Sequence, residues 1–257
     1  MDTIVTVLFI FWSSFIIVFA IVFHEMGHAF VAHVFRVTFE FIGLGIAIPI
    51  KFSILSIQSG RLQWKRIEWN GILKEFHIGS TKFVIGWLPI GGGVEIGEEI
   101  FWSHPWWQRL LIAPAGPIAN LVLAFGIFFL AFGFVNATIM TRELVQSATE
   151  ANIRMITGQI AIHDLTGPVG LVNMMVSSMK INLIMGSILM AAIINVAMAV
   201  TNLLPVPALD GGHIVISFLS AVFGSKNVRA IFTPVTRIVF TFLIVLMVIL
   251  SFKDILL

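Results

Sequence analysis

The residues best suited to chemistry are two histidines and a glutamate in the first part of the chain, where His24, Glu25 and His28 form the sequence HEMGH. In a helix, side chains four residues apart share one face, so the two imidazoles can reach a common point with the glutamate beside them. This arrangement can hold a zinc ion and position a general base. A buried His–Glu network that serves only the structure is the alternative reading.

The apolar surroundings of this motif favour the metal reading. The motif interrupts a long hydrophobic run, and a charge near the middle of a membrane costs at least about 2.5–3.5 kcal/mol. Catalytic zinc usually takes three protein ligands and keeps a fourth position for water, so a third ligand is needed. The chain has no Cys, and that ligand must therefore be another His or a carboxylate.

The composition of the chain is that of a membrane protein. Of its 257 residues, 58% are hydrophobic and 11% are charged, whereas a soluble domain has about 45–50% apolar and about 25% charged residues. No polar block is long enough for a second domain, so residues 1–257 are predicted to form a single membrane-embedded domain. The net charge of +2 and the scattered basic residues argue against nucleic-acid binding.

Four apolar segments are long enough to cross a bilayer, which takes about 20 residues. They are Ile4 to Val34, Leu110 to Val135, Leu183 to Leu204 and Pro234 to Phe252. The first follows Met-Asp directly, without a basic region or a cleavage site, and is predicted to be a retained helix. A weaker stretch, from Ile153 to Met179, is expected to be interfacial or re-entrant.

The distribution of basic residues predicts the orientation. Lys and Arg are concentrated between Arg36 and Arg109 and again after the third span, so both connections should face the cytoplasm and both termini should lie outside. Between residues 38 and 99 the chain is rich in β-branched and aromatic residues with Gly and Pro, which predicts short strands and hairpins. The run from Lys82 to Ile96 is apolar enough to be a hairpin that dips into the membrane, although an ordinary cytoplasmic hairpin is the alternative.

The predicted topology selects among the possible third ligands. His24 and His28 come late in a span that runs inward, and the third span also runs inward before reaching PVPALDGGH. Asp210 should therefore lie at the depth of the histidines, where Pro residues end the helix and Gly211 and Gly212 allow close backbone approach. The other candidates are His213 as runner-up, Asp164 and His163 on the outer side, and Glu95, Glu98 and Glu99 in a loop that reads more simply as solvated.

Three motifs together resemble those of the site-2 protease family of intramembrane zinc proteases. HEMGH lies in the first span, AGPIANLVLAF in the second and NLLPVPALDGGH after the third, in the order that the family has. The stretches WLPIGGGVEIGEE, WWQRLLIAPAGPIAN and LTGPVGL also resemble the bacterial branch that includes the regulator-of-sigma-E protease. The resemblance implies an all-α polytopic membrane protein with about four transmembrane helices and a membrane-associated β-hairpin region between the first two.

The resemblance also implies roles for individual residues. His24, His28 and Asp210 would bind one Zn²⁺ per chain, and Glu25 would be the general base. Asn120 and Asn202, and with them Gly91 and Gly92 of the hairpin, would position the substrate or polarise its carbonyl. A buried Asn can equally be a hydrogen-bonding contact between membrane helices, and that reading stays open for both asparagines.

Two departures from the family pattern bear on substrate choice. Only residues 136–182 lie where the bacterial branch commonly carries PDZ domains, too few for one, and an unidentified adaptor could supply that selectivity. Gly93 stands where the hairpin of the family often has an aromatic residue. The expected partners are the lipid bilayer and transmembrane or signal-peptide-like substrates, with no nucleic acid, and the expected location is the bacterial cytoplasmic membrane.

The function expected from these observations is intramembrane proteolysis, either in a regulatory cascade or in the clearance of signal-peptide remnants. Two alternatives remain. Zinc could serve structure or transport, which a fourth ligand such as His213 or a polar path along the spans would favour. The chain could also be an inactive module that retains helical substrates, but an intact Glu25 argues against that reading.

Overall fold

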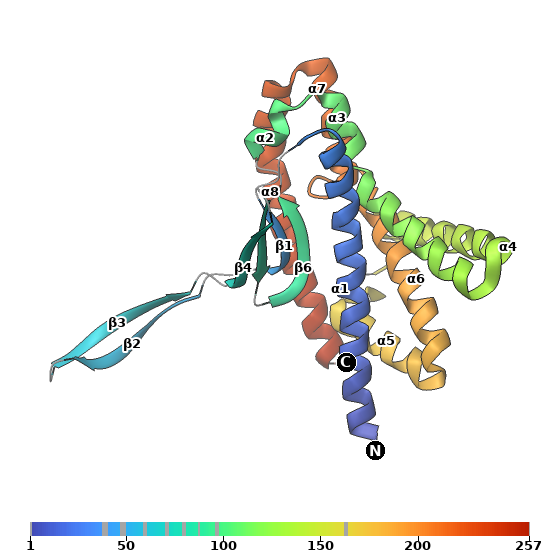
Figure 1. Ribbon diagram of the computed structural model, residues 1–257, viewed down its shortest axis with the longest axis horizontal. Helices are drawn as coiled ribbons and strands as arrows, with labels where there is room; N and C mark the ends of the chain where they lie inside the picture. The colour runs from blue at the N-terminus through green and yellow to red at the C-terminus, as the bar shows by residue number, and fades with distance from the viewer. Residues whose placement is uncertain are drawn as a thin grey trace.

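The structure is a computed structural model of the chain. It describes residues 2–37, 41–46, 50–58, 61–69, 72–78, 81–86, 88–95, 98–161 and 164–256, and for residues 41–100 it describes the backbone alone. The helices are α1 (Asp2–Val34), α2 (Glu98–Ser103), α3 (Trp106–Ile112), α4 (Ala115–Ile156), α5 (Pro168–Ile181), α6 (Leu183–Asn202), α7 (Asp210–Phe223) and α8 (Ser225–Leu256). Figure 1 shows α1 at the centre, with α4 and α6 on one side and the strands on the other.

Four helical stretches are long and apolar enough to cross a membrane, which agrees with the predicted number of spans. They are Thr3–Val34, Trp106–Ile156, Leu183–Asn202 and Ser225–Leu256. The last stretch begins earlier than predicted because Pro234 lies inside α8 rather than at its start. The chain is therefore a multi-pass membrane protein.

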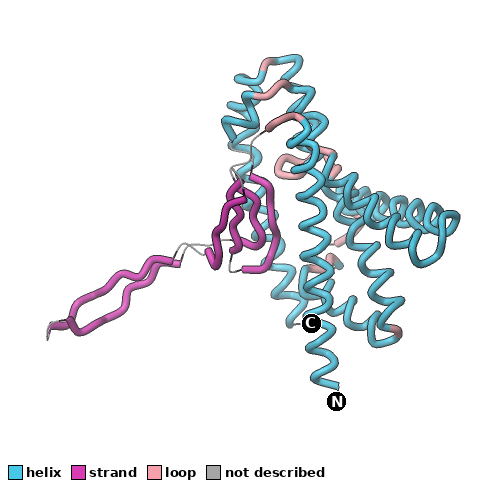
Figure 2. The backbone as a smooth tube through the Cα atoms, viewed as in Figure 1, coloured by secondary structure: helices cyan, strands magenta, loops and turns pink. Residues whose placement is uncertain are grey.

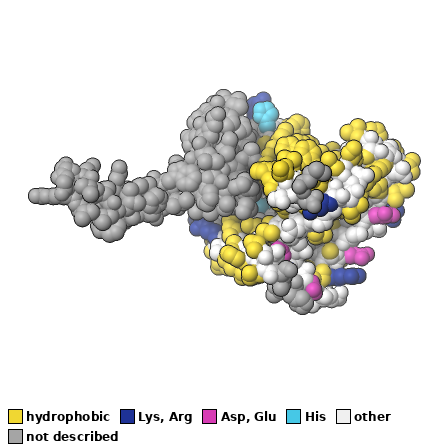
Figure 3. Space-filling view, turned by 90° about the horizontal axis from the view of Figure 1, so that it is seen from below, with side chains coloured by type: hydrophobic (Ala, Val, Ile, Leu, Met, Phe, Trp, Pro, Cys, Tyr) yellow, Lys and Arg dark blue, Asp and Glu magenta, His cyan; other side chains and the backbone are white. Residues whose placement is uncertain are grey.

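The exposed surface of these helices is itself apolar. Large hydrophobic side chains such as Leu130, at 86% exposure, and Ile184, at 73%, face outward. In the view from below, hydrophobic side chains cover broad areas of the described surface, and acidic and basic groups form small separate patches among them (Figure 3). Such a surface would be a liability in water, but it is the surface expected where a helix faces lipid.

Helix α4 bends sharply at Gly133 and packs back on itself. Gly133 has φ 79° and ψ 173°, a conformation that is essentially restricted to glycine. Ala124 and Phe128 before the bend and Ala137 after it are buried together with Ala192 of α6. The predicted span ended at Val135, but α4 continues after the bend as far as Ile156.

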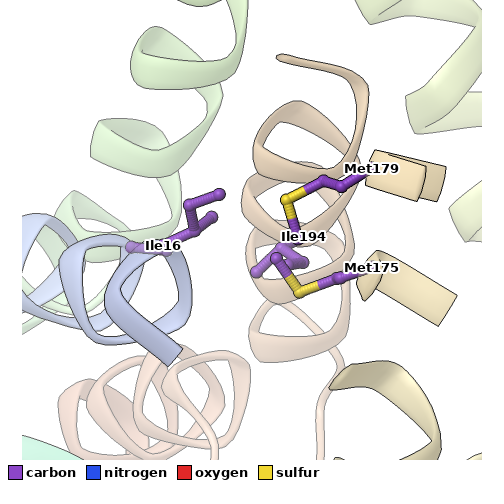
Figure 4. Close-up of a cluster of buried hydrophobic side chains, with 5 residues drawn as sticks. Ile16, Met175, Met179 and Ile194 are labelled. Carbon is purple, nitrogen blue, oxygen red and sulfur yellow. The ribbon is translucent and has the colours of Figure 1, made fainter. Parts of the chain in front are cut away.

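A second buried cluster joins three helices and includes the part of α1 that precedes the HEMGH motif. Ile16 of α1, Met175 and Met179 of α5 and Ile194 of α6 pack together (Figure 4). The segment that the sequence predicted to be interfacial or re-entrant therefore contributes a complete helix, α5, to the buried contacts of α1 and α6. The interfacial or re-entrant placement of this segment stays a prediction.

The connection between α1 and α2 contains strands. They are β1 (Phe41–Ile46), β2 (Ile50–Gln58), β3 (Arg61–Trp69), β4 (Ile72–Ile78), β5 (Thr81–Gly86) and β6 (Leu88–Glu95). β2 and β3 pair as a separate antiparallel ribbon, and the other four form a sheet in the order β4-β5-β1-β6, coloured magenta in Figure 2.

The sheet order corrects one detail of the sequence prediction. β5 and β6 cover the predicted hairpin from Lys82 to Ile96, but β1 lies between them, parallel to β5 and antiparallel to β6. An apolar strand such as β1 can pair along both edges, and a sequence pattern does not specify which neighbours it takes. β6 is an edge strand and lies against α1.

Candidate metal centre

The two histidines of HEMGH lie one turn apart on the buried side of α1. Their Nε2 atoms are 3.2 Å apart, and their rings meet edge to face with centroids 4.9 Å apart. His24 is buried, with 5% of its surface exposed. The Nδ1 atom of His28 lies 2.9 Å from the carbonyl oxygen of Ile112. In this hydrogen bond Nδ1–H donates to the carbonyl, which leaves the lone pair of Nε2 available to bind a metal ion.

Asp210, the first residue of α7, completes the group. Its Oδ2 atom is 3.1 Å from Nε2 of His24, and its Oδ1 atom is 3.3 Å from Nε2 of His28. The turn before α7 is tight, because a Cβ on Gly211 would collide with the carbonyl oxygens of Leu203 and Leu204. Glycine at this position therefore lets the chain reverse between α6 and α7 and bring Asp210 to the histidines.

Helix α4 lies against the two imidazoles at Gly116. A Cβ on Gly116 would collide with Nε2 of His28 and would lie 2.7 Å from Nε2 of His24. Gly27 of α1 is equally close to α4, since a Cβ there would lie 2.7 Å from the Cβ of Ala119. The two helices thus approach through small residues, and the imidazoles occupy the space that a side chain at position 116 would need.

The spacing of the three groups suits a shared metal ion. The two Nε2 atoms are 3.2 Å apart, close to the separation of about 3.3 Å between ligand atoms of tetrahedral zinc, and each lies 3.1–3.3 Å from a different carboxylate oxygen of Asp210. One ligand atom from each residue lies within 4.8 Å of the other two. In addition, the buried Oδ2 of Asp210 has no hydrogen-bond partner despite its closeness to His24. Within the described residues, His24, His28 and Asp210 are the group of three that can hold a metal ion.

The charge of Asp210 suits a cation. Burial alone raises the pKa of this carboxyl, but the contacts with His24 and then with His28 outweigh it and lower the pKa to about 2. The group is therefore a carboxylate at neutral pH, and two imidazoles with one carboxylate form an N₂O donor set that is common for catalytic zinc.

His213, the runner-up for the third ligand, lies one turn further along α7 and is not in this group. Its ring meets Phe101 edge to face at 5.4 Å, and its Nδ1 is buried without a hydrogen-bond partner. Burial lowers the pKa of His213, so the ring is neutral at pH 7. Asp164 is exposed in the connection between α4 and α5, while His163 and the side chains of Glu95, Glu98 and Glu99 lie outside the described residues.

The remaining predicted site residues lie on α1, α4, α6 and β6. Glu25 follows His24 on α1 and is half-buried. Asn120 lies one turn after Gly116 on α4, fully buried, and neither amide atom has a hydrogen-bond partner. Asn202 is the last residue of α6 and is half-buried. Gly91 and Gly92 belong to β6.

Sequence reasoning gave no role to two residues that shape this site, Gly116 and Ile112. Gly116 was visible in the motif AGPIAN, but its contact with the imidazoles depends on how α4 crosses α1. Ile112 orients His28 through its backbone carbonyl, and the pattern of side chains in a sequence does not indicate such a contact.

A polar metal group on apolar helices defines the class of the molecule as a membrane-embedded metalloprotein. The sequence model of peptidase family M50 matches residues 59–247, which is well over half of the chain. The chain therefore belongs to peptidase family M50, and the predicted membership in the site-2 proteases is confirmed. The matched range includes Asp210 and both asparagines, and the HEMGH motif lies ahead of it.

Curated relatives carry the names of metalloproteases. Zinc metalloprotease RasP of Bacillus licheniformis is 34% identical over 115 residues, 45% of this chain and 27% of that protein. Regulator of sigma-W protease RasP of Bacillus subtilis is 30% identical over 125 residues, 49% of this chain and 28% of that protein. Zinc metalloprotease RasP of Geobacillus kaustophilus is 34% identical over 125 residues, which are 48% of this chain and 28% of that protein. The alignments thus span little more than a quarter of these relatives.

Proposed function

We propose that this protein is an intramembrane zinc metalloendopeptidase that hydrolyses peptide bonds in or near transmembrane segments of other proteins. The observation that carries the proposal is the group formed by His24, His28 and Asp210, whose ligand atoms lie within 4.8 Å of one another, with Glu25 next to the first histidine. Membership in peptidase family M50 and the names of the relatives support the same reaction.

The proposed division of labour follows from these positions. His24, His28 and Asp210 hold one zinc ion per chain, which would supply a Lewis acid that brings the pKa of water to about 7 and polarises a carbonyl. Glu25 takes the proton from the attacking water. It then returns that proton to the departing amine, the usual reversal of a general base into a general acid.

Substrate positioning is assigned to α4, α6 and the edge of the sheet. Asn120 and Asn202 would donate to the carbonyl of the scissile bond or of its neighbour, and the unpartnered amide of the buried Asn120 supports such a role. β6, with Gly91 and Gly92, pairs with β1 on one side only and lies against α1. An extended substrate segment can add to its free edge, as in other strand-addition recognition.

The substrates are expected to be single transmembrane helices or signal-peptide remnants that unwind locally. A helix hides its carbonyls in hydrogen bonds four residues apart, so helix-breaking residues near the cut should favour cleavage. Either regulatory release of a membrane-held protein or clearance of remnants fits this chemistry. An adaptor protein would provide the selectivity that a PDZ domain gives elsewhere.

For the membrane topology we propose a bacterial cytoplasmic membrane with both termini outside and the metal group toward the cytoplasm. The support is the concentration of Lys and Arg between residues 36 and 109 and after α7, according to the positive-inside rule. The sheet would then be a cytoplasmic, membrane-associated element beside the active site.

Cleavage of a model single-span substrate by purified protein in detergent tests the proposal. We expect a defined cut, its loss on treatment with a chelator, and its recovery when one equivalent of zinc is restored. If the protein binds zinc firmly yet leaves several such substrates intact, zinc for structure or transport becomes the better account.

A further inference from the structure

Arg109 of α3 is a buried cation whose role neither the motif nor the proposed chemistry explains. Its side chain is 1% exposed, which makes it one of the most completely buried large side chains that the structure describes. Its Nη2 donates to Ser220 Oγ at 2.7 Å and to Ser225 Oγ at 3.0 Å. Among the described residues its partners are thus hydroxyl groups, and its Nε and Nη1 have no hydrogen-bond partner.

Aromatic rings compensate part of the cost of burying this charge. The guanidinium carbon lies 4.6 Å from the ring centroid of Trp102 and 5.3 Å from that of Phe101. A planar guanidinium can stack on rings and still donate hydrogen bonds in its own plane, which an ammonium group cannot do. Within the part of the chain whose side chains the structure describes, no acidic group pairs with Arg109, and burying a charge in this way is costly. What Arg109 contributes must therefore be sought in the elements that it joins.

The geometry shows which elements Arg109 joins. Ser220 lies in the last turn of α7, and Ser225 is the first residue of α8. Gly224 between the two helices has φ 81°, so the corner itself is a turn that glycine permits. One guanidinium nitrogen therefore holds both sides of the α7–α8 corner against α3.

Both elements that Arg109 connects also carry parts of the metal centre. On α3, the carbonyl of Ile112 lies 2.9 Å from His28 Nδ1. On α7, Asp210 begins the helix of which Ser220 lies near the end, about 15 Å further along at the usual helical rise. The helix α7 therefore links the contact of Arg109 rigidly to the carboxylate of Asp210.

Polar side chains follow one side of α7 from Asp210 to Ser220. Ser217 and Ser220 are buried, and with His213 they follow Asp210 at spacings of three or four residues, which places all four on one side of the helix. Ser220 Oγ in turn donates to the carbonyl oxygen of Ser217 at 2.8 Å. Rotation or sliding of α7 would therefore break the contacts of Arg109 and displace Asp210 together.

We propose that Arg109 is a positioning residue for the metal centre: by fixing the far end of α7 to α3, it sets the separation between His28 and Asp210. The inference rests on the proposed function in that the centre is taken to bind zinc. It adds a residue that would act through the ligands without touching the metal.

Zinc affinity and a spectroscopic signature test this role in the purified full-length protein. Zinc binding is measured by competition with a chromophoric chelator, and the visible spectrum is recorded with Co²⁺ in place of zinc. Arg109→Met should weaken zinc binding by about 10–100-fold, as loss of groups that orient metal ligands does, and should shift the Co²⁺ bands. Arg109→Lys should recover part of the affinity, and Arg142→Met, at an exposed position of α4, should change neither.

Ser220→Ala provides a milder variant in case Arg109→Met folds poorly. It should weaken zinc binding to a smaller extent, and Arg109→Met/Ser220→Ala should be no weaker than Arg109→Met alone, because the two side chains act through one contact. Wild-type affinity and unshifted Co²⁺ bands in Arg109→Met would overturn the inference while leaving the protease proposal intact. A wild-type protein that binds no zinc would contradict both.

Discussion

The α-carbon of Gly116 lies directly behind the imidazole of His28, so that a Cβ at position 116 would collide with Nε2, the atom that faces Asp210. The ligand pair is therefore shaped by α4 as well as by α1, which carries it. Because Gly27 makes a similarly close approach from α1 to α4, the helix crossing and the ligand geometry depend on the same small residues.

Gly116→Ala should remove zinc binding without unfolding the protein. The added methyl group must displace both imidazoles, because the contacting atoms belong to the rings themselves. Metal content after gel filtration measures the effect. The matched control is Gly126→Ala on the same helix, where a Cβ meets no atom within 4 Å, and full zinc occupancy in Gly116→Ala would contradict the described geometry.

Asp210→Ala and His213→Gln distinguish the two possible third ligands. Asp210→Ala leaves two imidazoles, too few for tight binding of catalytic zinc, and should lose the metal. His213→Gln should keep it, because His213 is outside the group of converging ligand atoms. The reverse pattern of zinc contents would assign the third ligand to His213 instead.

Gly133→Ala should destabilise the protein while leaving the metal centre unchanged. At φ 79° and ψ 173°, a residue with a Cβ is strained by about 1–3 kcal/mol, although the space around it is open. Thermal unfolding in detergent should show a lower midpoint than for Gly126→Ala, which is in regular helix. Equal midpoints for the two variants would mean that α4 does not bend at Gly133 as described.

Asp254→Ala should lower stability by about 1–2 kcal/mol, the usual effect of losing a side-chain cap. The carboxylate of Asp254 accepts a hydrogen bond from the backbone N–H of Gly170 at 2.8 Å, in the first turn of α5, where an anion also opposes the positive end of the helix dipole. The same thermal measurement applies, with the exposed Glu150→Ala as control. A larger effect at Glu150 than at Asp254 would count against this cap.

Much of the helical architecture could be predicted because it depends on local properties of the sequence. The apolar length of α1, α4, α6 and α8 gave the number of spans, and the spacing of His24 and His28 placed them on one helical face. Asp210 followed from an argument about depth in the membrane, and the structure brings it within 3.3 Å of the histidines. Its role as a ligand stays a prediction until metal content is measured.

The features that sequence reasoning missed depend on contacts between distant segments. The carbonyl of Ile112 orients His28 across 84 residues of sequence, and Arg109 meets Ser220 across 111. The pairing of β1 between β5 and β6 was missed for the same reason. The turn at Gly133 was not predicted, because the residues after it form a second helical half that packs back on the first, a contact within α4 that no local pattern reports.

Cleavage by wild-type protein and by Glu25→Gln, with bound zinc measured in both samples, tests the central claim most directly. Glu25 is not a proposed ligand, so the variant should keep its zinc, and loss of the general base should slow cleavage by about 10²–10⁴-fold. Equal cleavage by both proteins would show that Glu25 is not the base, and loss of zinc from Glu25→Gln would show that its role belongs to metal binding instead.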